Sequence, residues 1–303
     1  MNLPEKKVAI IGANGYLGRN LSFFLHQRAH LIQNFDVQDC SEHSWMSYEK
    51  LDIRDEKSLS KIDPENDFVL FFSGITGAWN GFNNYKNFIE LNEIGLLNVL
   101  NYIRISKSKS KIIFPSSRLV YKGIKNEQIS EDGEKETKTI YAINKLSGEK
   151  ILKLYFEMFG IQYTIYRISV PYGNIVGKDY SYGTVGFFLN QAEKQNQLTL
   201  YGDGSLRRTF TYIEDVCNLI SLSMVKTEAT NEIYNIGGEN YSLLEIASHI
   251  LSKFKNGSIK HVPWDENNLK VESGDTIFNS NKIDTLCNYQ YKQSFKSWLD
   301  QIF

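Results

Sequence analysis

Tyr141 and Lys145 are the residues whose types and spacing most directly suggest chemistry. They stand four positions apart, so on a helix their side chains lie on one face, one turn apart. A phenol in water loses its proton near pH ~10, which is too high for a base that works at neutral pH, and a neighbouring ammonium group lowers that pKa. The pair therefore indicates a general base that takes a proton from a hydroxyl group. An aromatic ring that simply packs on a lysine stem is the alternative.

A glycine-rich turn near the N-terminus predicts a site for a pyrophosphate. Residues 8–11 have the apolar run of a buried parallel strand, and apolar residues recur at helical spacing over residues 17–28. The glycines of the turn are Gly12, Gly15 and Gly18. A helix that starts there offers free N–H groups and the positive end of its dipole, and glycine lets the backbone approach the phosphates. The spacing departs from the usual Gly-x-Gly-x-x-Gly pattern, so an ordinary glycine-rich turn is the alternative.

Asp36 favours NAD over NADP as the dinucleotide. It closes the second predicted strand, residues 31–35, about twenty positions past the glycines. A carboxylate there hydrogen-bonds the ribose 2′-hydroxyl of NAD and repels the 2′-phosphate of NADP. Asp39 is the alternative partner for that ribose. Asp52, followed by Ile53 at the end of a third predicted strand, would meet the adenine amino group.

Alternating strands and helices predict an α/β fold with a doubly wound parallel (Rossmann) sheet, whose ligands bind at the carboxyl ends of the strands. The fourth predicted strand, residues 68–72, runs into Ser73 and Gly74, which are small enough to let the backbone approach a cofactor. A helix begins near Tyr85 and contains Asn92 among its apolar residues. A buried, hydrogen-bonded asparagine is the simplest explanation of that position.

Ser117 and Tyr141 are expected to face one site. The fifth predicted strand, residues 112–114, ends in Pro115-Ser116-Ser117, and the helix that carries Tyr141 runs to about Phe159. A serine at the carboxyl end of one strand and a tyrosine at the start of the next helix can lie at the same edge of a doubly wound sheet.

The parallel pattern breaks after about residue 170. We expect residues 1–170, with 211–238 returning to them, to form the dinucleotide-binding domain. Residues 171–210 and 239–303 are expected to form a smaller C-terminal substrate-binding lobe.

Bulk composition excludes several classes of function. The formal net charge of −1 and the absence of a basic stripe argue against nucleic acid and membrane surfaces as partners. Apolar runs are strand-sized, and the first seven residues lack the apolar core of a signal peptide. Three scattered cysteines favour a reducing compartment, and the five histidines show no ligand-like spacing. We therefore expect a cytoplasmic protein without a metal.

In its motifs the chain resembles the extended short-chain dehydrogenase/reductase family, in its nucleotide-sugar epimerase/dehydratase branch, over nearly its whole length. The segments that carry the resemblance are residues 12–18, 36, 52–53, 92, 116–121, 141–145 with 149, 167–173, 201–204, 208–210 and 234–238. The resemblance implies tightly bound NAD, a UDP- or GDP-linked sugar as substrate and a homodimer.

The resemblance also implies roles for single residues. Tyr141 would deprotonate a sugar hydroxyl, usually at C4, as hydride leaves that carbon. Lys145 would hold the nicotinamide ribose and lower the pKa of Tyr141, and Ser117 would hydrogen-bond the same sugar oxygen. The implied catalytic residues are Ser117, Tyr141 and Lys145. The implied cofactor contacts are Gly12, Gly15, Tyr16, Leu17, Gly18, Asp36, Asp52, Ile53, Ser73, Gly74, Asn92, Tyr141 and Lys145. The implied substrate contacts are Ser116, Ser117, Arg118, Asn174, Leu200, Tyr201, Arg208 and Asp275.

Departures from the family pattern narrow the chemistry. Family members that eliminate water across C5–C6 carry Thr-Asp-Glu where this chain has Ser117-Arg118-Leu119, so a 4,6-dehydratase is disfavoured. A Cys/His pair of the kind used by the reductases that make GDP-fucose is not apparent. A 4-epimerase and a net 4-dehydrogenase in the synthesis of surface-polysaccharide precursors, on a hexose or a GDP-linked heptose, both fit. A non-catalytic NAD-binding sensor is the rival, against which the intact Ser117, Tyr141 and Lys145 argue.

The predicted diphosphate site departs from the family as well. Arg208 would contact the diphosphate, a bidentate match of guanidinium to phosphate, with a surface arginine as the alternative. Glu272 stands before Gly274-Asp275, where the family commonly has an arginine. The usual second phosphate contact is therefore in doubt. Lys270 is a candidate replacement, with an exposed surface lysine as the favoured alternative.

Overall fold

The computed structural model describes residues 5–28, 30–41, 46–177, 180, 182–195, 197–255 and 257–303. The first four residues of the predicted dinucleotide-binding domain, and residues 29 and 42–45 within it, lie outside this part of the chain. The same holds for residues 178, 179, 181, 196 and 256 of the predicted lobe. Among the described helices, none has both the length and the apolar character that crossing a membrane requires.

A seven-stranded sheet forms the centre of the structure, in the order β11-β7-β5-β4-β1-β2-β3, and every neighbouring pair is parallel. The predicted doubly wound parallel sheet is thereby confirmed. Its strands are β1 (Lys7–Ile11), β2 (Leu31–Asp36), β3 (Tyr48–Lys50), β4 (Phe68–Phe71), β5 (Lys111–Ser117), β7 (Tyr163–Ile168) and β11 (Glu232–Asn235).

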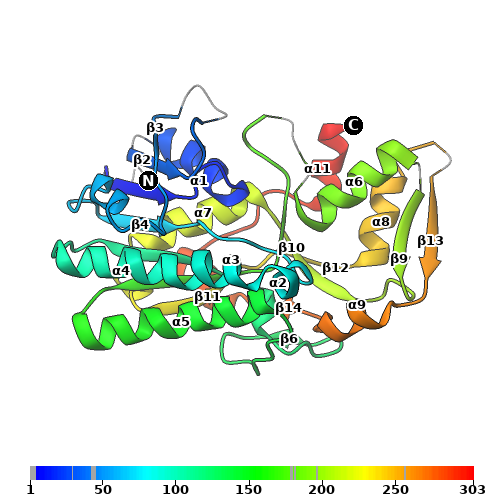
Figure 1. The fold of residues 1–303 in the computed structure, drawn as a ribbon. Helices are drawn as coiled ribbons and strands as arrows, with labels where there is room; N and C mark the ends of the chain where they lie inside the picture. Colours follow the sequence, from blue (N-terminus) through cyan, green and yellow to red (C-terminus); the bar gives the residue numbers. More distant parts are fainter. Residues whose placement is uncertain are drawn as a thin grey trace.

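Helices cover both faces of this sheet (Figure 1). In β1, Val8 and Ile10 join one buried apolar cluster while Ala9 and Ile11 join the other, because successive side chains of a strand point to opposite faces. The first cluster lies under α1 (Tyr16–His26), α7 (Ile213–Met224) and α10 (Asn281–Cys287). The second lies under α4 (Gly95–Ile105) and α5 (Ile140–Phe159). The prediction placed α10 in the lobe, but it packs on α7 and β11 because Ile283 completes the first cluster.

The helix predicted from Tyr85 is interrupted by a π-helical turn. Its parts are α3 (Tyr85–Ile89), the π turn η2 (Glu90–Ile94) and α4. Asn92 lies in the π turn, and its side chain accepts a hydrogen bond from the Ile75 N–H at 3.0 Å and donates to the Ile75 carbonyl at 3.1 Å. Such turns are rare and concentrate at functional sites. Here the π turn directs Asn92 to the loop that follows β4.

Two smaller sheets are formed by strands that follow β7 in the sequence. One has the order β12-β10-β8 and another pairs β13 with β9 (Figure 1). A third buried apolar cluster joins their strands to α6, α8 and α11. The elements are β8 (Val170–Tyr172), α6 (Gly183–Gln195), β9 (Gln197–Tyr201), β10 (Arg207–Tyr212), β12 (Glu239–Ser242), α8 (Leu243–Leu251), β13 (Ser258–Val262) and α11 (Phe295–Ile302). This part draws on the two separated segments that the sequence assigns to the lobe.

The remaining elements are short. They are η1 (Ser58–Lys61), α2 (Asn80–Asn83), η3 (Arg118–Val120), β6 (Gln128–Ile129), η4 (Thr227–Ala229), α9 (Glu266–Val271) and β14 (Ile277–Phe278). β6 pairs with β14 in parallel, which joins the segment before α5 to the C-terminal part of the chain.

Candidate active site

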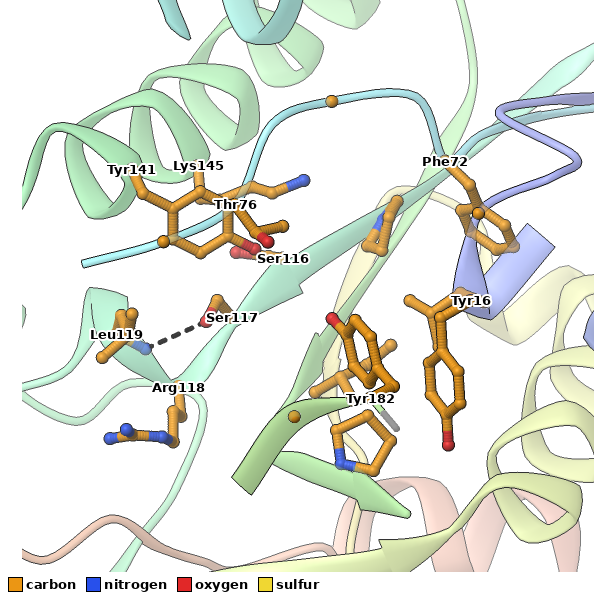
Figure 2. A pocket seen from close by; sticks show the side chains of 18 of the residues that line it. Tyr16, Phe72, Thr76, Ser116, Ser117, Arg118, Leu119, Tyr141, Lys145 and Tyr182 are labelled. Carbon is orange, nitrogen blue, oxygen red and sulfur yellow. Dashed lines mark hydrogen bonds between the residues drawn. The ribbon is translucent and has the colours of Figure 1, made fainter. Parts of the chain in front are cut away.

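A cavity of about 500 Å³ lies where the carboxyl ends of β4 and β5 meet the start of α5. Figure 2 shows the side chains that face it. Those named by the sequence prediction are Gly15, Tyr16, Leu17, Ser73, Gly74, Asn92, Ser116, Ser117, Arg118, Tyr141 and Lys145. The cavity therefore brings the three predicted catalytic residues together with part of the predicted cofactor site.

Tyr141 and Lys145 enter the cavity from the first turns of α5 (Figure 2). Thr139 starts this helix, since its Oγ1 accepts a hydrogen bond from the Ala142 N–H at 3.0 Å. The Lys145 Nζ lies 5.7 Å from the centroid of the Tyr141 ring and 4.6 Å from that of Phe114. The pair is thus on one helix face, as its spacing predicts, and the ammonium group rests over an aromatic ring.

Burial governs the ionisation of this pair. It lowers the pKa of Lys145 to about 8, although Glu149 acts in the opposite direction. Burial raises the pKa of Tyr141, the nearby Tyr182 hydroxyl adds to the rise, and the nearby Ser117 hydroxyl acts in the opposite direction. The loss of solvent around the phenolate therefore dominates the pKa of Tyr141, and a lowering of that pKa by Lys145 stays a prediction.

The two serines at the end of β5 have different partners. Ser117 lines the cavity beside Tyr141, and its Oγ accepts a hydrogen bond from the Leu119 N–H at 3.2 Å (Figure 2). Ser116 instead donates to the Glu149 carboxylate at 2.5 Å. This geometry favours Ser117 over Ser116 as the serine that meets a ligand beside Tyr141.

Glu149 and Arg167 form a buried ion pair behind the cavity. The Arg167 guanidinium donates to both carboxylate oxygens of Glu149, at 2.8 and 2.6 Å, and the two side chains are only 3% and 5% exposed. A further guanidinium nitrogen donates to the Tyr121 hydroxyl at 2.6 Å. Because Glu149 belongs to α5, Arg167 to β7 and Ser116 to β5, this network fixes α5 against the sheet edge that carries Ser117.

A second cavity, of about 330 Å³, shares Gly15, Ser73 and Gly74 with the first. The predicted cofactor residues Gly12, Asp36, Asp52 and Ile53 line it. The two cavities therefore form one path along the glycine turn and the end of β4, as a dinucleotide requires.

Of Asp36 and Asp39, the two candidate partners for the ribose, Asp36 is the one that lines this second cavity. Its carboxylate accepts hydrogen bonds from the N–H groups of Asn14, at 3.1 Å, and Val37, at 2.8 Å. Asp39 is instead paired with Lys50 at 2.6 Å, and its side chain is 89% exposed. The buried Oδ1 of Asn14 has no hydrogen-bond partner in the described part of the chain and can accept one from a ligand hydroxyl. The residues present thus fit a dinucleotide with a free ribose 2′-hydroxyl.

Two glycines of the turn are required by close packing. Gly12 has a φ of 88°, in the left-handed region, and a Cβ there would lie 2.5 Å from the Ser73 nitrogen. A Cβ on Gly18 would lie 2.1 Å from the Gly12 carbonyl oxygen. Because neither position has a side chain, the start of α1 can pack closely against the ends of β1 and β4.

The remaining predicted substrate residues do not line either cavity. They are Asn174, Leu200, Tyr201, Arg208 and Asp275. Arg208 is paired with Glu272 at 2.7 Å and its side chain is 3% exposed. Both carboxylate oxygens of Asp275 accept backbone N–H groups, from Arg207 at 2.8 Å and Asn126 at 3.0 Å. Leu200 is part of the third apolar cluster, and Tyr201 stacks on Trp264.

Tyr182 lines the cavity although no motif singles it out. Its ring stacks on that of Tyr16, with centroids 4.0 Å apart and planes 8° apart (Figure 2). It comes from the Gly- and Tyr-rich segment before α6. That composition indicates a ligand-facing loop, but only the fold shows that this tyrosine meets the glycine turn.

Comparison with known proteins gives independent information. Residues 8–237 match the model of the family described as NAD dependent epimerase/dehydratase. The chain is 30% identical over 282 residues, 86% of its length and 85% of the relative's, to a UDP-N-acetyl-alpha-D-glucosaminuronate decarboxylase of Bacillus cytotoxicus. It is 34% identical over 139 residues to an uncharacterized UDP-glucose epimerase of Bacillus subtilis, spanning 46% of this chain and 43% of that protein.

A similar fold is found among solved structures. The UDP-glucose 4-epimerase of Thermus thermophilus in complex with NAD superposes with a TM-score of 0.85 over 98% of both chains, at 20% identity. At that identity the likeness concerns the fold, which is the Rossmann-like sheet described above.

Enlarging Gly18 should weaken NAD binding. In Gly18→Ala the new Cβ forces α1 away from the glycine turn, so we expect at least a tenfold loss of NAD affinity, measured by calorimetric titration. Gly160→Ala is the control, since Gly160 ends α5 with a φ of 72° and open space around it. That variant should lose thermal stability but bind NAD as the parent does. Equal NAD affinity in Gly18→Ala and the parent protein would contradict the assignment of the turn.

Removing the Glu149 charge should destabilise the fold. In Glu149→Gln the buried Arg167 loses its counter-ion, and such a change costs about 3–5 kcal/mol of unfolding free energy. Urea denaturation measures this loss. Glu157→Gln on the same helix is the control, because Glu157 only meets Lys153 at 3.9 Å on the exposed surface, and its loss should cost less than ~1 kcal/mol. Similar losses in the two variants would show that the buried pair does not hold α5 in place.

Proposed function

Because the chain belongs to the family of NAD-dependent epimerases and dehydratases, we propose that it oxidises C4 of a sugar carried on a nucleoside diphosphate, as a 4-epimerase or a 4-dehydrogenase. The observation that carries the proposal is the convergence of Ser117, Tyr141 and Lys145 on one cavity that continues into the glycine turn. The cofactor of the family is NAD.

In this proposal Tyr141 and Ser117 act on the same sugar oxygen. Ser117, which lines the same cavity as Tyr141, holds the substrate hydroxyl in line with the Tyr141 hydroxyl. Tyr141 takes the proton of that hydroxyl as the carbon is oxidised. NAD⁺, when bound, would supply the acceptor for the hydride and a positive charge. Because burial raises the pKa of Tyr141, positive charge within the cavity is what makes the tyrosine a base.

Lys145 supplies part of that charge. Its pKa of about 8 leaves it mainly protonated at neutral pH and neutral above that value. It approaches Tyr141 from the following turn of α5, within reach of the ribose that a nicotinamide in this cavity would carry. We therefore assign to it the binding of the nicotinamide ribose and the stabilisation of the Tyr141 phenolate.

The residues after Ser117 favour these reactions over elimination of water. A 4,6-dehydration needs an acid and a base beside the catalytic serine to move protons at C5 and C6. Arg118 and Leu119 occupy that stretch and line the cavity. A guanidinium stays protonated and an alkyl side chain has no proton to exchange, so neither serves as that acid or base.

Replacing Tyr141 should abolish turnover but not NAD binding. Tyr141→Phe removes only the hydroxyl, and loss of a general base lowers the rate by roughly 10²–10⁴-fold. Tyr155→Phe is the matched control on the same helix, because the Tyr155 hydroxyl lies away from the cavity and, among the described residues, hydrogen-bonds Asn101 at 3.3 Å. Turnover is followed with UDP-, GDP-, dTDP- and CDP-sugars by NADH absorbance and product mass.

Product mass separates the candidate reactions. An isomer of unchanged mass indicates the 4-epimerase, and a loss of two hydrogens with NADH formed indicates the 4-dehydrogenase. Loss of water would contradict the argument from Arg118 and Leu119. NAD binding without reaction on any sugar would favour a non-catalytic sensor, and full turnover in Tyr141→Phe would remove Tyr141 from the mechanism.

We also propose that the protein pairs with a second copy through α4 and α5. The two helices lie side by side on one face of the sheet (Figure 1). They expose Ile105 and Met158, at 72% and 64%, and α5 also exposes Ile143 and Leu154 beside a groove. An apolar surface shared by neighbouring helices suits an isologous contact between identical chains.

A charge on this surface should separate the subunits. Leu154→Glu places a carboxylate where the two apolar surfaces would meet, so the mass measured by light scattering should fall from that of a dimer to that of a monomer. Lys153→Gln, one position along on the exposed surface, should leave the mass unchanged. A monomeric parent protein would refute the pairing.

A further inference from the structure

Arg118 presents an incompletely bonded guanidinium to the large cavity. It follows Ser117 at the start of η3 and lies on the opposite side of that serine from Tyr141 (Figure 2). A guanidinium has five N–H donors. The hydrogen bond that the Arg118 guanidinium makes within the described part of the chain is to the Thr276 hydroxyl, at 3.3 Å. Most of its donors are thus available to a ligand.

Arg208, which the family resemblance assigns to the diphosphate, has its donors engaged. It donates to Glu272 at 2.7 Å, to the Gly274 carbonyl at 2.7 Å and to the Arg207 carbonyl at 2.9 Å. Asp275 adds a second opposite charge nearby. Arg208 is therefore buried, neutralised and absent from the lining of the large cavity.

The charges around Arg118 leave it without a counter-ion of its own. Arg208 repels it, and the attraction of Glu272 is shared, because that carboxylate already accepts Arg208 and the Gly274 N–H at 3.0 Å. Burial and this repulsion lower the pKa of Arg118 to about 9. A partly buried cation without a dedicated partner is unfavourable, and an anion that enters the cavity relieves it.

We propose that Arg118, rather than Arg208, binds the anionic oxygens of the substrate. The inference rests on the proposed function and states which side chain recognises the charged part of the nucleotide sugar. Two parts of such a molecule offer paired anionic oxygens to a guanidinium: the diphosphate and, in a hexuronate, the sugar carboxylate. In either case this chain has Glu272 where the family commonly has an arginine, and it has Arg118 directly after Ser117. The positive charge that meets the ligand is therefore shifted to a position next to Ser117.

The test compares Arg118→Gln with the parent protein. Calorimetric titration is carried out with UDP, GDP, dTDP and CDP, with the matching nucleosides, and with UDP-glucose and UDP-glucuronate. If Arg118 binds the diphosphate, Arg118→Gln loses at least tenfold in affinity for the diphosphate that the parent binds best, and nucleoside binding is unchanged. If it binds a sugar carboxylate, affinity for UDP is kept and UDP-glucuronate alone loses at least tenfold. Unchanged affinity for every ligand overturns the inference.

Controls separate this inference from a folding defect and from the proposed function. Arg207→Gln removes a neighbouring guanidinium that pairs with Glu245 at 3.1 Å outside the cavity, and it should bind every ligand as the parent does. NAD affinity in Arg118→Gln should equal that of the parent, which shows that the fold is intact. If the parent protein binds NAD but none of the nucleotides or nucleotide sugars, the proposed function itself fails.

The Arg208–Glu272 pair is removed as a unit in the double variant Arg208→Gln with Glu272→Gln, so that no buried charge is left alone. The inference expects nucleotide affinity within threefold of the parent. If the double variant loses tenfold in nucleotide affinity while Arg118→Gln binds as the parent does, Arg208 is the residue that binds the anionic oxygens, and the inference is overturned.

Discussion

The buried ion pair between Glu149 and Arg167 is the interaction on which the geometry of the site depends. It joins α5 to β7, and the Ser116 hydroxyl extends it to β5. α5 carries Tyr141, Lys145 and Glu149 along one row, four positions apart, so fixing the third residue against the sheet sets the depth and rotation of the other two. Ser117 is the next residue on β5 after the anchored Ser116. The distance between the serine and the tyrosine is thus determined by a buried ion pair that does not line the cavity.

Burial makes this site dependent on the charges that ligands bring. It lowers the pKa of Lys145 and raises that of Tyr141, so the cavity disfavours both the ammonium and the phenolate. Aromatic rings supply much of the surrounding surface: Phe114 lies under Lys145, and Tyr16 stacks on Tyr182. A low-dielectric cavity of this kind strengthens every interaction with a charged ligand. In the proposed reaction, the charges of the oxidised cofactor and of the substrate therefore help to determine whether Tyr141 can act as a base.

Local patterns predict the parts of the site that depend on spacing along the chain. The row on α5, the glycine turn before α1 and Asp36 at the end of β2 follow from helix periodicity and strand order, and the parallel sheet is confirmed. Features that depend on distant contacts are not predictable in this way. The π turn at Asn92 arises from hydrogen bonds to Ile75, seventeen positions away in the chain, and changes the direction of one side chain without altering the helical pattern.

Arg118 and Arg208 show that local sequence patterns also fail to predict which charged side chain is free to bind a ligand. In sequence Arg208 lies in a family motif and Arg118 stands in place of an acid, so the motif favours Arg208 for the diphosphate. The pairing that decides between them joins Arg208 to Glu272, sixty-four positions later in the chain. Glu272 is a departure from the family pattern whose partner only the fold reveals. In this chain Glu272 neutralises Arg208, and in our proposal recognition of the anionic ligand passes to Arg118, whose charge Glu272 does not fully balance.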